Sequence, residues 1–188
     1  MVMKYFLYAL LAVLFVWYTL SPCEKTIQRN LRKMAIDTFE VFNECGVYYW
    51  ADFGTLLGIV RENDIILGDN DVDVCIPNDQ RTVNIMDSCA IPALIQRGYR
   101  VERMDWSAYR VRYKGLFVDV YITNESGDTI IGATGENSNI PKRLVGTPRD
   151  FVWNSTTVKV PQYVHETLIW RYGEDYMTPR RGDKGRDS

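Results

Sequence analysis

The chain has 188 residues, of which 46% are hydrophobic and 13% aromatic, enough for one packed domain and a short appendage. This composition excludes disorder for most of the chain. The net charge of −2 provides no broad basic surface for phosphate backbones, so nucleic acid is excluded as the expected partner.

The first 22 residues carry an apolar segment. After Lys4, the sixteen residues 5–20 contain no charge, which is short against the roughly 20 residues of a typical membrane span. A cleaved signal peptide, and hence a secreted protein, is therefore the alternative. The bulky Trp17 and Tyr18 disfavour cleavage, so we expect residues 1–22 to be a signal anchor with the domain in the lumen.

The next segments alternate between helical and extended patterns. Residues 24–45 carry apolar side chains at three- and four-residue steps, which predicts an amphipathic helix ending at Gly46. The aromatic and β-branched residues 47–52 predict a buried strand. A short helix is expected at 55–63, where the GTLLG stretch leads into apolar residues.

Residues 71–77, DVDVCIP, alternate acidic and apolar side chains, which predicts a strand with the acids on one face. Residues 78–97 have a helical composition, and a break is expected at Pro92, which lacks an amide hydrogen. Three further strands are predicted, the last two joined by a turn at 114–115: 99–104, 107–113 and 116–123.

The remaining segments complete a mixed fold. The Gly- and Ser-rich residues 125–138 predict a loop or irregular hairpin, 149–161 a hairpin, and 162–173 a closing helix. The charged segment 180–188 is expected to be disordered. Strands interspersed with helices predict an α+β (mixed α/β) domain over residues 23–179, with a mixed sheet flanked by helices.

The acidic strand is the main functional signal. Residues two apart on a strand share a face, so Asp71 and Asp73 should present neighbouring carboxylates that repel by about 3 kcal/mol at ~5 Å. A hard divalent cation, Mg²⁺ or Mn²⁺, offsets such repulsion. Asp119 lies between apolar neighbours on another predicted strand and is expected as a third ligand, because burying an unpaired carboxylate is costly.

The acids have two other interpretations. A solvated acidic loop is compatible with the spacing alone. A calcium-binding EF-hand loop starting at Asp69 is excluded, because its sixth residue is Val74 instead of glycine and its twelfth is Gln80 instead of glutamate.

A small-residue turn and a nearby arginine are candidate substrate-binding groups. Gly54 allows close backbone approach, and with Thr55 it opens the short helix, whose first amides can bind a phosphate. Arg61 follows, and its guanidinium matches phosphate oxygens.

Four cysteines, at positions 23, 45, 75 and 89, lack the CxxC spacing of a zinc site, and both one disulfide and inert buried thiols stay open. Acceptor sequons at Asn124 and Asn154 fit a lumenal domain.

These motifs occur together in a known order. GTLLG, Arg61, D-N-D-V-D, F-V-D-V and Y-G-E-D-Y-M-T-P resemble the LicD/fukutin family of phosphotransferases, which have the nucleotidyltransferase superfold, over about residues 47–179. The resemblance implies that Gly54 and Thr55 form the superfold's small-residue turn and that Asp71 and Asp73 are its metal-binding pair. It also implies that Asp119 is the third acid and that Asp69 is an additional acid of the family.

By the same resemblance, the protein should move a phosphorylated alcohol, such as phosphocholine or ribitol phosphate, from a CDP-activated donor to a glycan acceptor, using Mg²⁺ or Mn²⁺. Asp69 or Asp119 would act as the base. A type II protein of the Golgi or endoplasmic-reticulum membrane is typical of the family's eukaryotic members. A nucleotide-sugar glycosyltransferase with a DxD motif and a non-catalytic glycan-binding scaffold of the same fold stay as alternatives.

Overall fold

A computed structural model describes residues 2–105 and 107–179, and describes side chains from residue 24 onward. Within this described part, no helix has both the length and the apolar character that a bilayer crossing requires. The predicted anchor at residues 1–22 lies outside the residues whose side chains are described, and the predicted disordered tail at 180–188 lies outside the described residues altogether. Both stay predictions.

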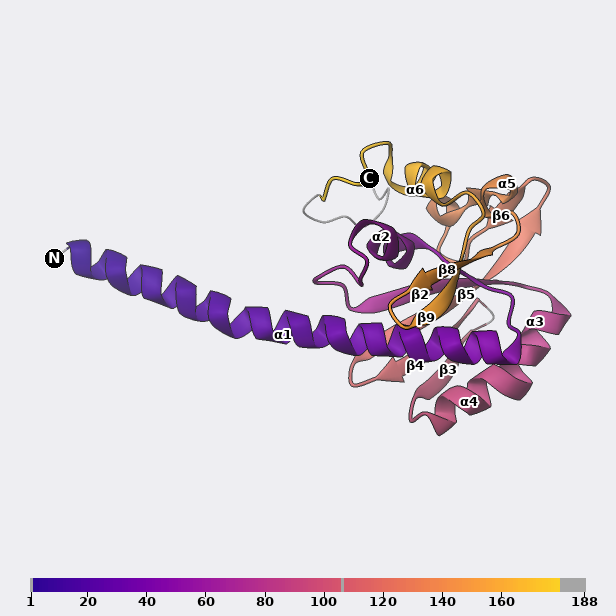
Figure 1. The fold of residues 1–188 in the computed structure, drawn as a ribbon, viewed down its shortest axis with the longest axis horizontal. Helices are drawn as coiled ribbons and strands as arrows, with labels where there is room; N and C mark the ends of the chain where they lie inside the picture. Colours follow the sequence, from indigo (N-terminus) through magenta and orange to yellow (C-terminus); the bar gives the residue numbers. More distant parts are fainter. Residues whose placement is uncertain (1, 106, 180–188) are drawn as a thin grey trace.

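The first helix, α1 (Val2–Cys45), has 44 residues. Its N-terminal part projects away from the domain, and its C-terminal part lies along the sheet (Figure 1). Leu31, Met34, Phe39 and Phe42 on its inner face are all buried. The predicted amphipathic helix is therefore confirmed, because apolar residues at three- and four-residue steps lie on one face of the helix and that face is buried.

A mixed sheet forms the centre of the domain, with strand order β1-β2-β5-β4-β3. β2 and β5 run parallel, and the other pairs in this order are antiparallel. The short β6 and β7 extend the sheet from the far end of β5. The strand bounds are β1 (Trp50–Ala51), β2 (Asp71–Pro77), β3 (Arg100–Met104), β4 (Ala108–Tyr113), β5 (Leu116–Ser126), β6 (Thr129–Ile131) and β7 (Ile140–Pro141).

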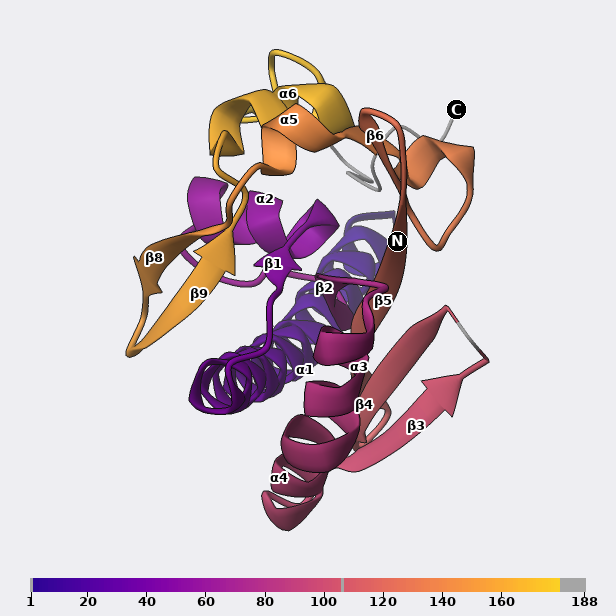
Figure 2. The ribbon, with the colours of Figure 1, turned by 90° about the vertical axis from the view of Figure 1, so that its right-hand side faces the viewer.

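One face of this sheet is apolar and covered by helices. Val72, Val74, Val118 and Val120 are fully buried there, and α1 lies over them together with α3 (Gln80–Ile85) and α4 (Ile91–Gln96) (Figure 2). Each such side chain contributes roughly 1.5–3 kcal/mol when removed from water. The alternation along β2 and β5 therefore directs the acids to the opposite face.

Two predicted elements differ from the structure. The helix expected to break at Pro92 instead continues from α3 through a π-helical turn, η1 (Met86–Ala90), into α4, where Pro92 lies in the first turn and its missing amide is not needed. The predicted strand 47–52 is paired only at Trp50–Ala51, because Asp52 already caps the next helix, α2 (Phe53–Arg61).

The C-terminal third completes the second side of the domain. The predicted hairpin is present as β8 (Arg149–Trp153) and β9 (Thr156–Val160), and the closing helix as α6 (Val164–Tyr172). Between β5 and β8 the chain forms β6, β7 and two short helices, η2 (Glu136–Ser138) and α5 (Lys142–Val145).

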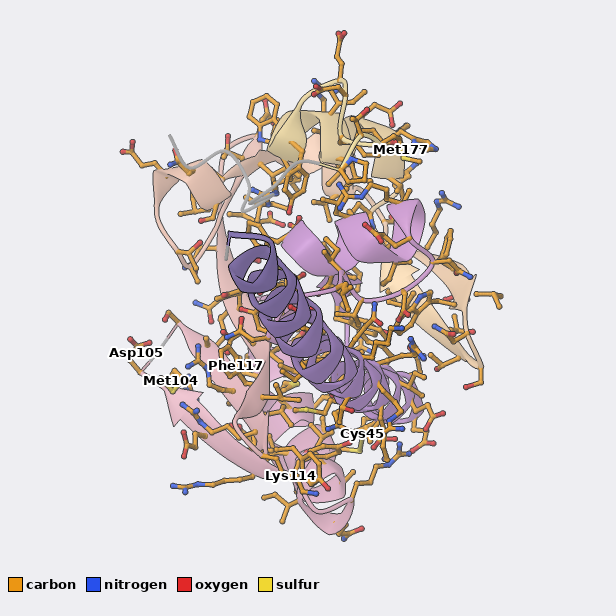
Figure 3. The ribbon with its side chains drawn as sticks, turned by 90° about the vertical axis from the view of Figure 1, so that its left-hand side faces the viewer. Cys45, Met104, Asp105, Lys114, Phe117 and Met177 are labelled. Atoms are coloured by element: carbon orange, nitrogen blue, oxygen red, sulfur yellow. A yellow bond between two sulfur atoms is a disulfide. The ribbon has the colours of Figure 1, made fainter. Side chains whose placement is uncertain are left out.

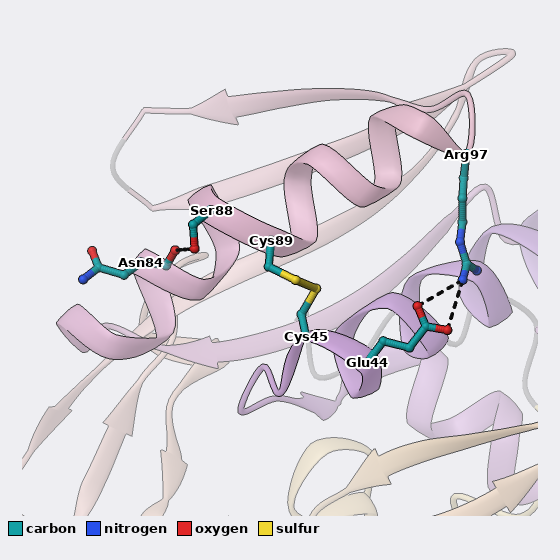
Figure 4. The surroundings of a disulfide bond; sticks show 6 residues. All are labelled: Glu44, Cys45, Asn84, Ser88, Cys89 and Arg97. Atoms are coloured by element: carbon teal, nitrogen blue, oxygen red, sulfur yellow. Dashed lines mark hydrogen bonds and ion pairs between the residues drawn. A yellow bond between two sulfur atoms is a disulfide. The ribbon is translucent and has the colours of Figure 1, made fainter.

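A disulfide joins α1 to the helices beneath the sheet. Cys45, the last residue of α1, is bonded to Cys89 in η1, and Arg97 beside it contacts Glu44 (Figure 4). Cys75 in β2 is a buried free thiol. The structure thus contains both a disulfide and a buried thiol, the two possibilities that the sequence left open.

Candidate active site

The strand register brings the predicted acids together. Asp73 on β2 lies opposite Asp119 on the parallel strand β5, and Asp71 lies two residues earlier on the same face as Asp73. Neighbouring strands are separated by about 4.8 Å, so Asp73 and Asp119 project side by side. The three carboxylates thus share one face near the start of β2.

The environment of Asp73 disfavours its negative charge. Burial, followed by the charges of Asp71 and Asp119, raises the pKa of Asp73 well above its usual range. Asp52 and Asp69 act in the same direction. Crowded carboxylates behave in this way, and a cation bound beside Asp73 would reverse the effect.

Arg110 neutralises one of the acids. Its Nε and Nη2 donate to the two carboxylate oxygens of Asp119 at 2.5 and 2.7 Å, and Arg110 lies opposite Asp119 in the β4–β5 register. The guanidinium stacks on Phe117, 4.2 Å from the ring centroid; Phe117 is labelled on β5 in Figure 3. Asp119 is therefore held in an ion pair, where the sequence predicted a metal ligand.

The acidic side chains offer a divalent cation two carboxylate ligands on one face of the sheet. Among the described side chains, no group of three acidic, histidine or cysteine residues is arranged to enclose a metal. Asp71 and Asp73 nevertheless provide two carboxylates on one face, and their mutual repulsion is of the kind that Mg²⁺ or Mn²⁺ relieves. The pair fits a cation, whereas Asp119 already accepts a hydrogen bond from Arg110 at each of its oxygens, so Arg110 competes with a cation for that carboxylate.

The Gly54–Thr55 turn is bonded to the acidic strand. The backbone amide of Asp73 donates to Thr55 Oγ1 at 2.7 Å. A Cβ added to Gly54 would lie 3.3 Å from Oδ2 of Asp69, so this carboxylate sits directly over the turn. The first turn of α2 therefore faces the acids, and its amides can bind an anion between them.

The second glycine of GTLLG has a packing role. A Cβ on Gly58 would lie 2.5 Å from the carbonyl oxygen of Asp64, so only glycine lets the 62–69 loop pack against α2. Asp64 in turn forms an ion pair with Arg32 of α1. This packing fixes the loop that carries Asp69.

A buried ion pair anchors the start of α2. Asp52, the N-cap of α2, accepts a hydrogen bond from the Phe53 amide and is bonded through both oxygens to Arg171 of α6, at 3.0 and 2.7 Å. The two side chains are only 1% and 4% exposed. Arg171 also donates to the carbonyl of Ser138 at the end of η2, so one guanidinium joins α2, α6 and η2.

Two tyrosines border the acid cluster. Burial and then the charge of Asp73 raise the pKa of Tyr121, which stands two residues after Asp119 on β5. Burial, Asp52 and Asp73 raise the pKa of Tyr172 on α6. Both phenols thus stay protonated at neutral pH and can donate hydrogen bonds toward the site.

Arg61 lies at the opposite end of α2 from the Gly54–Thr55 turn. It ends α2, about 10 Å along the helix from Gly54. Its side chain is 5% exposed and donates to the carbonyl of Tyr176 and to Glu62. These contacts join α2 to the C-terminal segment, and the role of Arg61 in substrate binding stays a prediction.

The family model of the LicD/FKTN/FKRP nucleotidyltransferase domain matches residues 46–163, more than half of the chain. The chain belongs to the LicD/FKTN/FKRP family. The matched segment runs from β1 to β9 and contains both acidic strands and the Gly54–Thr55 turn. The resemblance drawn from the motifs is therefore confirmed.

Two curated relatives are uncharacterised proteins of Rickettsia. The protein of Rickettsia typhi (strain ATCC VR-144 / Wilmington) is 34% identical over 73 residues, 39% of this chain and 23% of the relative. The protein of Rickettsia prowazekii (strain Madrid E) is 31% identical over 104 residues, 54% of this chain and 36% of the relative. The LicD-family chain thus matches well under half of the length of each.

Among solved structures, the solution structure of the antibiotic-resistance factor ANT(2'')-Ia is similar with a TM-score of 0.50, at 14% identity, covering 76% of this chain and 70% of that one. A crystal structure of ANT(2'')-Ia in complex with adenylyl-2''-tobramycin gives a TM-score of 0.48 at 12% identity, over 69% and 68% of the two chains. At this identity, the likeness to the solution structure shows a shared fold only.

Three charged residues of this LicD-family site were missed from the sequence. Arg110 was within reach, because the predicted turn at 114–115 sets a hairpin register in which residue 110 lies opposite Asp119. Asp52 and Arg171 are separated by 119 residues, and no local pattern indicates that they meet. Their pairing depends on how α6 packs against α2.

A separate cavity of about 1190 Å³ lies at the other end of the parallel strands. Pro77, the last residue of β2, lines it, six residues and thus about 20 Å from Asp71. Its wall combines amides and hydroxyls with charges of both signs, including Asp79 and Lys159. It is therefore distinct from the acid cluster.

Arg171→Leu is expected to destabilise the domain by about 3–5 kcal/mol, because it leaves the carboxylate of Asp52 buried without its partner. Equilibrium unfolding in urea measures the loss, with the exposed Arg143→Leu as the matched control. A loss no larger than that of the control would show that the pair does not anchor α2.

Asp73→Asn is expected to raise the melting temperature of chelator-treated protein at neutral pH. The folded-state pKa of Asp73 lies above its unfolded value, so its contribution to stability is greatest at low pH and falls as pH rises through the folded pKa. The advantage of asparagine should therefore grow from about pH 4 upward. Thermal unfolding across pH measures this, and an Asn variant less stable at neutral pH would contradict it.

Proposed function

We propose that this LicD-family domain transfers a phosphorylated alcohol, such as phosphocholine or ribitol phosphate, from a CDP-activated donor to a hydroxyl of a glycan. The observation that carries the proposal is the placement of Asp71, Asp73 and Asp119 on adjacent parallel strands beside the first turn of α2. Family membership supports the reaction class.

The acids and the turn would bind different parts of the donor diphosphate. Asp71 and Asp73 would hold Mg²⁺ or Mn²⁺, which supplies positive charge against the donor diphosphate when bound. The amides of Gly54 and Thr55 at the start of α2 would bind the phosphate oxygens. The bond from the Asp73 amide to Thr55 Oγ1 keeps these two groups at a fixed separation.

The reaction is a substitution at phosphorus. The acceptor hydroxyl oxygen forms a new bond to the phosphorus that carries the alcohol, the bond from that phosphorus to the bridging oxygen breaks, and CMP leaves with this oxygen. Asp69 would accept the hydroxyl proton, since its carboxylate lies over the Gly54 turn. Asp119 is less suited to this role because both of its oxygens accept hydrogen bonds from Arg110.

Analysis of the reaction products distinguishes this proposal from two alternatives. A nucleotide-sugar glycosyltransferase would leave a glycosidic link without phosphate, and a glycan-binding scaffold would release no CMP. Family membership disfavours the first. The clustered acids disfavour the second, because a scaffold has no need of carboxylates that repel one another.

The same proposal includes a lumenal, membrane-attached domain, in the Golgi or endoplasmic reticulum. The disulfide between Cys45 and Cys89 supports an oxidising compartment. The sequon residues Asn124 and Asn154 are both exposed, as acceptors of glycans must be.

Asp71→Asn and Asp73→Asn are each expected to reduce CMP release by at least about a hundredfold, because each removes a charge that holds the metal. Release is measured with Mn²⁺, a panel of CDP-linked alcohols and a glycan acceptor. Asp150→Asn, which alters an exposed acid on β8, is the matched control and should keep full activity. Ordinary turnover in purified Asp71→Asn protein would contradict the mechanism.

A further inference from the structure

Arg110 occupies a position that the metal-site hypothesis leaves unexplained. Its guanidinium forms two hydrogen bonds to Asp119, whose side chain is only 5% exposed. Arg110 is thus paired with one carboxylate of a cluster whose members repel one another.

The surroundings hold the guanidinium close to the rest of the cluster. Arg110 stacks on Phe117, and Phe117 lies opposite Asp71 in the β2–β5 register. The hydrogen bond that Arg110 donates to Asp119 raises the pKa of Arg110, and the charge of Asp71 acts in the same direction. The side chain keeps a quarter of its surface in solvent, which leaves room for it to move.

We propose that Arg110 is a positioning residue that keeps Asp119 in an ion pair until a divalent cation takes that carboxylate, and that the displaced guanidinium then binds the donor phosphates. The inference rests on the proposed function. It explains why Asp119 has the register of a metal ligand but the contacts of a salt bridge. A guanidinium released beside a diphosphate has the fork geometry to bind it.

Arg112 provides a matched control on the same strand. It is two residues further along β4, on the same face, and stacks on the same Phe117 ring at 6.0 Å. Its Nε donates to Glu102 on β3, outside the acid cluster. Substituting Arg112 therefore removes one positive charge from the same face and leaves the bond to Asp119 in place.

Binding of Mn²⁺ alone, followed by electron paramagnetic resonance of the free ion, tests the first half. Arg110→Ala should bind Mn²⁺ at least about tenfold more tightly than the wild type, because a charge-assisted hydrogen-bonded pair no longer competes for Asp119. Arg112→Ala should change the affinity much less. In an Asp119→Asn background the effect of Arg110→Ala should vanish, since the competition runs through that carboxylate.

Binding of CDP at saturating Mn²⁺, measured by calorimetry, tests the second half. Arg110→Ala should weaken it about tenfold or more although it strengthens binding of Mn²⁺ alone. Arg110→Lys, which keeps the charge but loses the fork, should lie between alanine and wild type for both ligands and serves if the alanine variant does not fold.

Failure of the Arg110 proposal and failure of the proposed function give different results. Wild-type protein that binds Mn²⁺, with Arg110 variants that bind it no more tightly than Arg112→Ala, overturns the inference and leaves the proposed function standing. Effects of the same sign on Mn²⁺ and on CDP also overturn it. Wild-type protein that binds no Mn²⁺ overturns both.

Discussion

Repulsion among carboxylates on two adjacent parallel strands is the interaction on which the rest of the site depends. The valines that alternate with the acids must pack against α1, α3 and α4, so Asp71, Asp73 and Asp119 cannot turn away from one another without exposing the core. The packing of the valines on one face of the sheet thereby holds the mutually repelling carboxylates together on the opposite face. Such arrangements are typical of functional sites, where stability is lost in exchange for a poised group.

Other parts of the domain hold this arrangement in position. Arg110 neutralises Asp119, and Thr55 accepts the amide hydrogen of Asp73. The pair of Asp52 and Arg171 fixes the start of α2 next to the acids and links it to α6. A helix N-terminus, a basic side chain and several carboxylates are therefore held within one small region, which suits the binding of a polyanion together with a cation.

Much of this was predictable from local patterns. The period-two alternation of 71–77 defined β2 and placed its acids on one face, and the helical spacing of 24–45 defined the second half of α1. The parallel pairing of β2 with β5 was not visible in either strand, since 38 residues separate Pro77 from Leu116 and helices and two strands intervene. Only the proximity of the two strands was predicted, from the cost of burying Asp119 unpaired and from the family resemblance.

The interactions that were missed are those between distant segments. The π-helical turn before Pro92 depends on backbone bonds that composition does not reveal, and the bond between Arg171 and Asp52 requires the packing of α6 on α2. The pairing of Arg110 with Asp119 is a different case. It follows from a local hairpin and was overlooked because basic residues on a strand resemble an ordinary solvated face.

The most direct test of the central claim is an anomalous-difference map from crystals of the protein grown with Mn²⁺ and CDP. A single strong peak between the carboxylates of Asp71 and Asp73, with the nucleotide phosphates on the side of the α2 N-terminus, is the result that the account predicts. A peak bound elsewhere, or nucleotide bound with those two carboxylates contacting no cation, would contradict it.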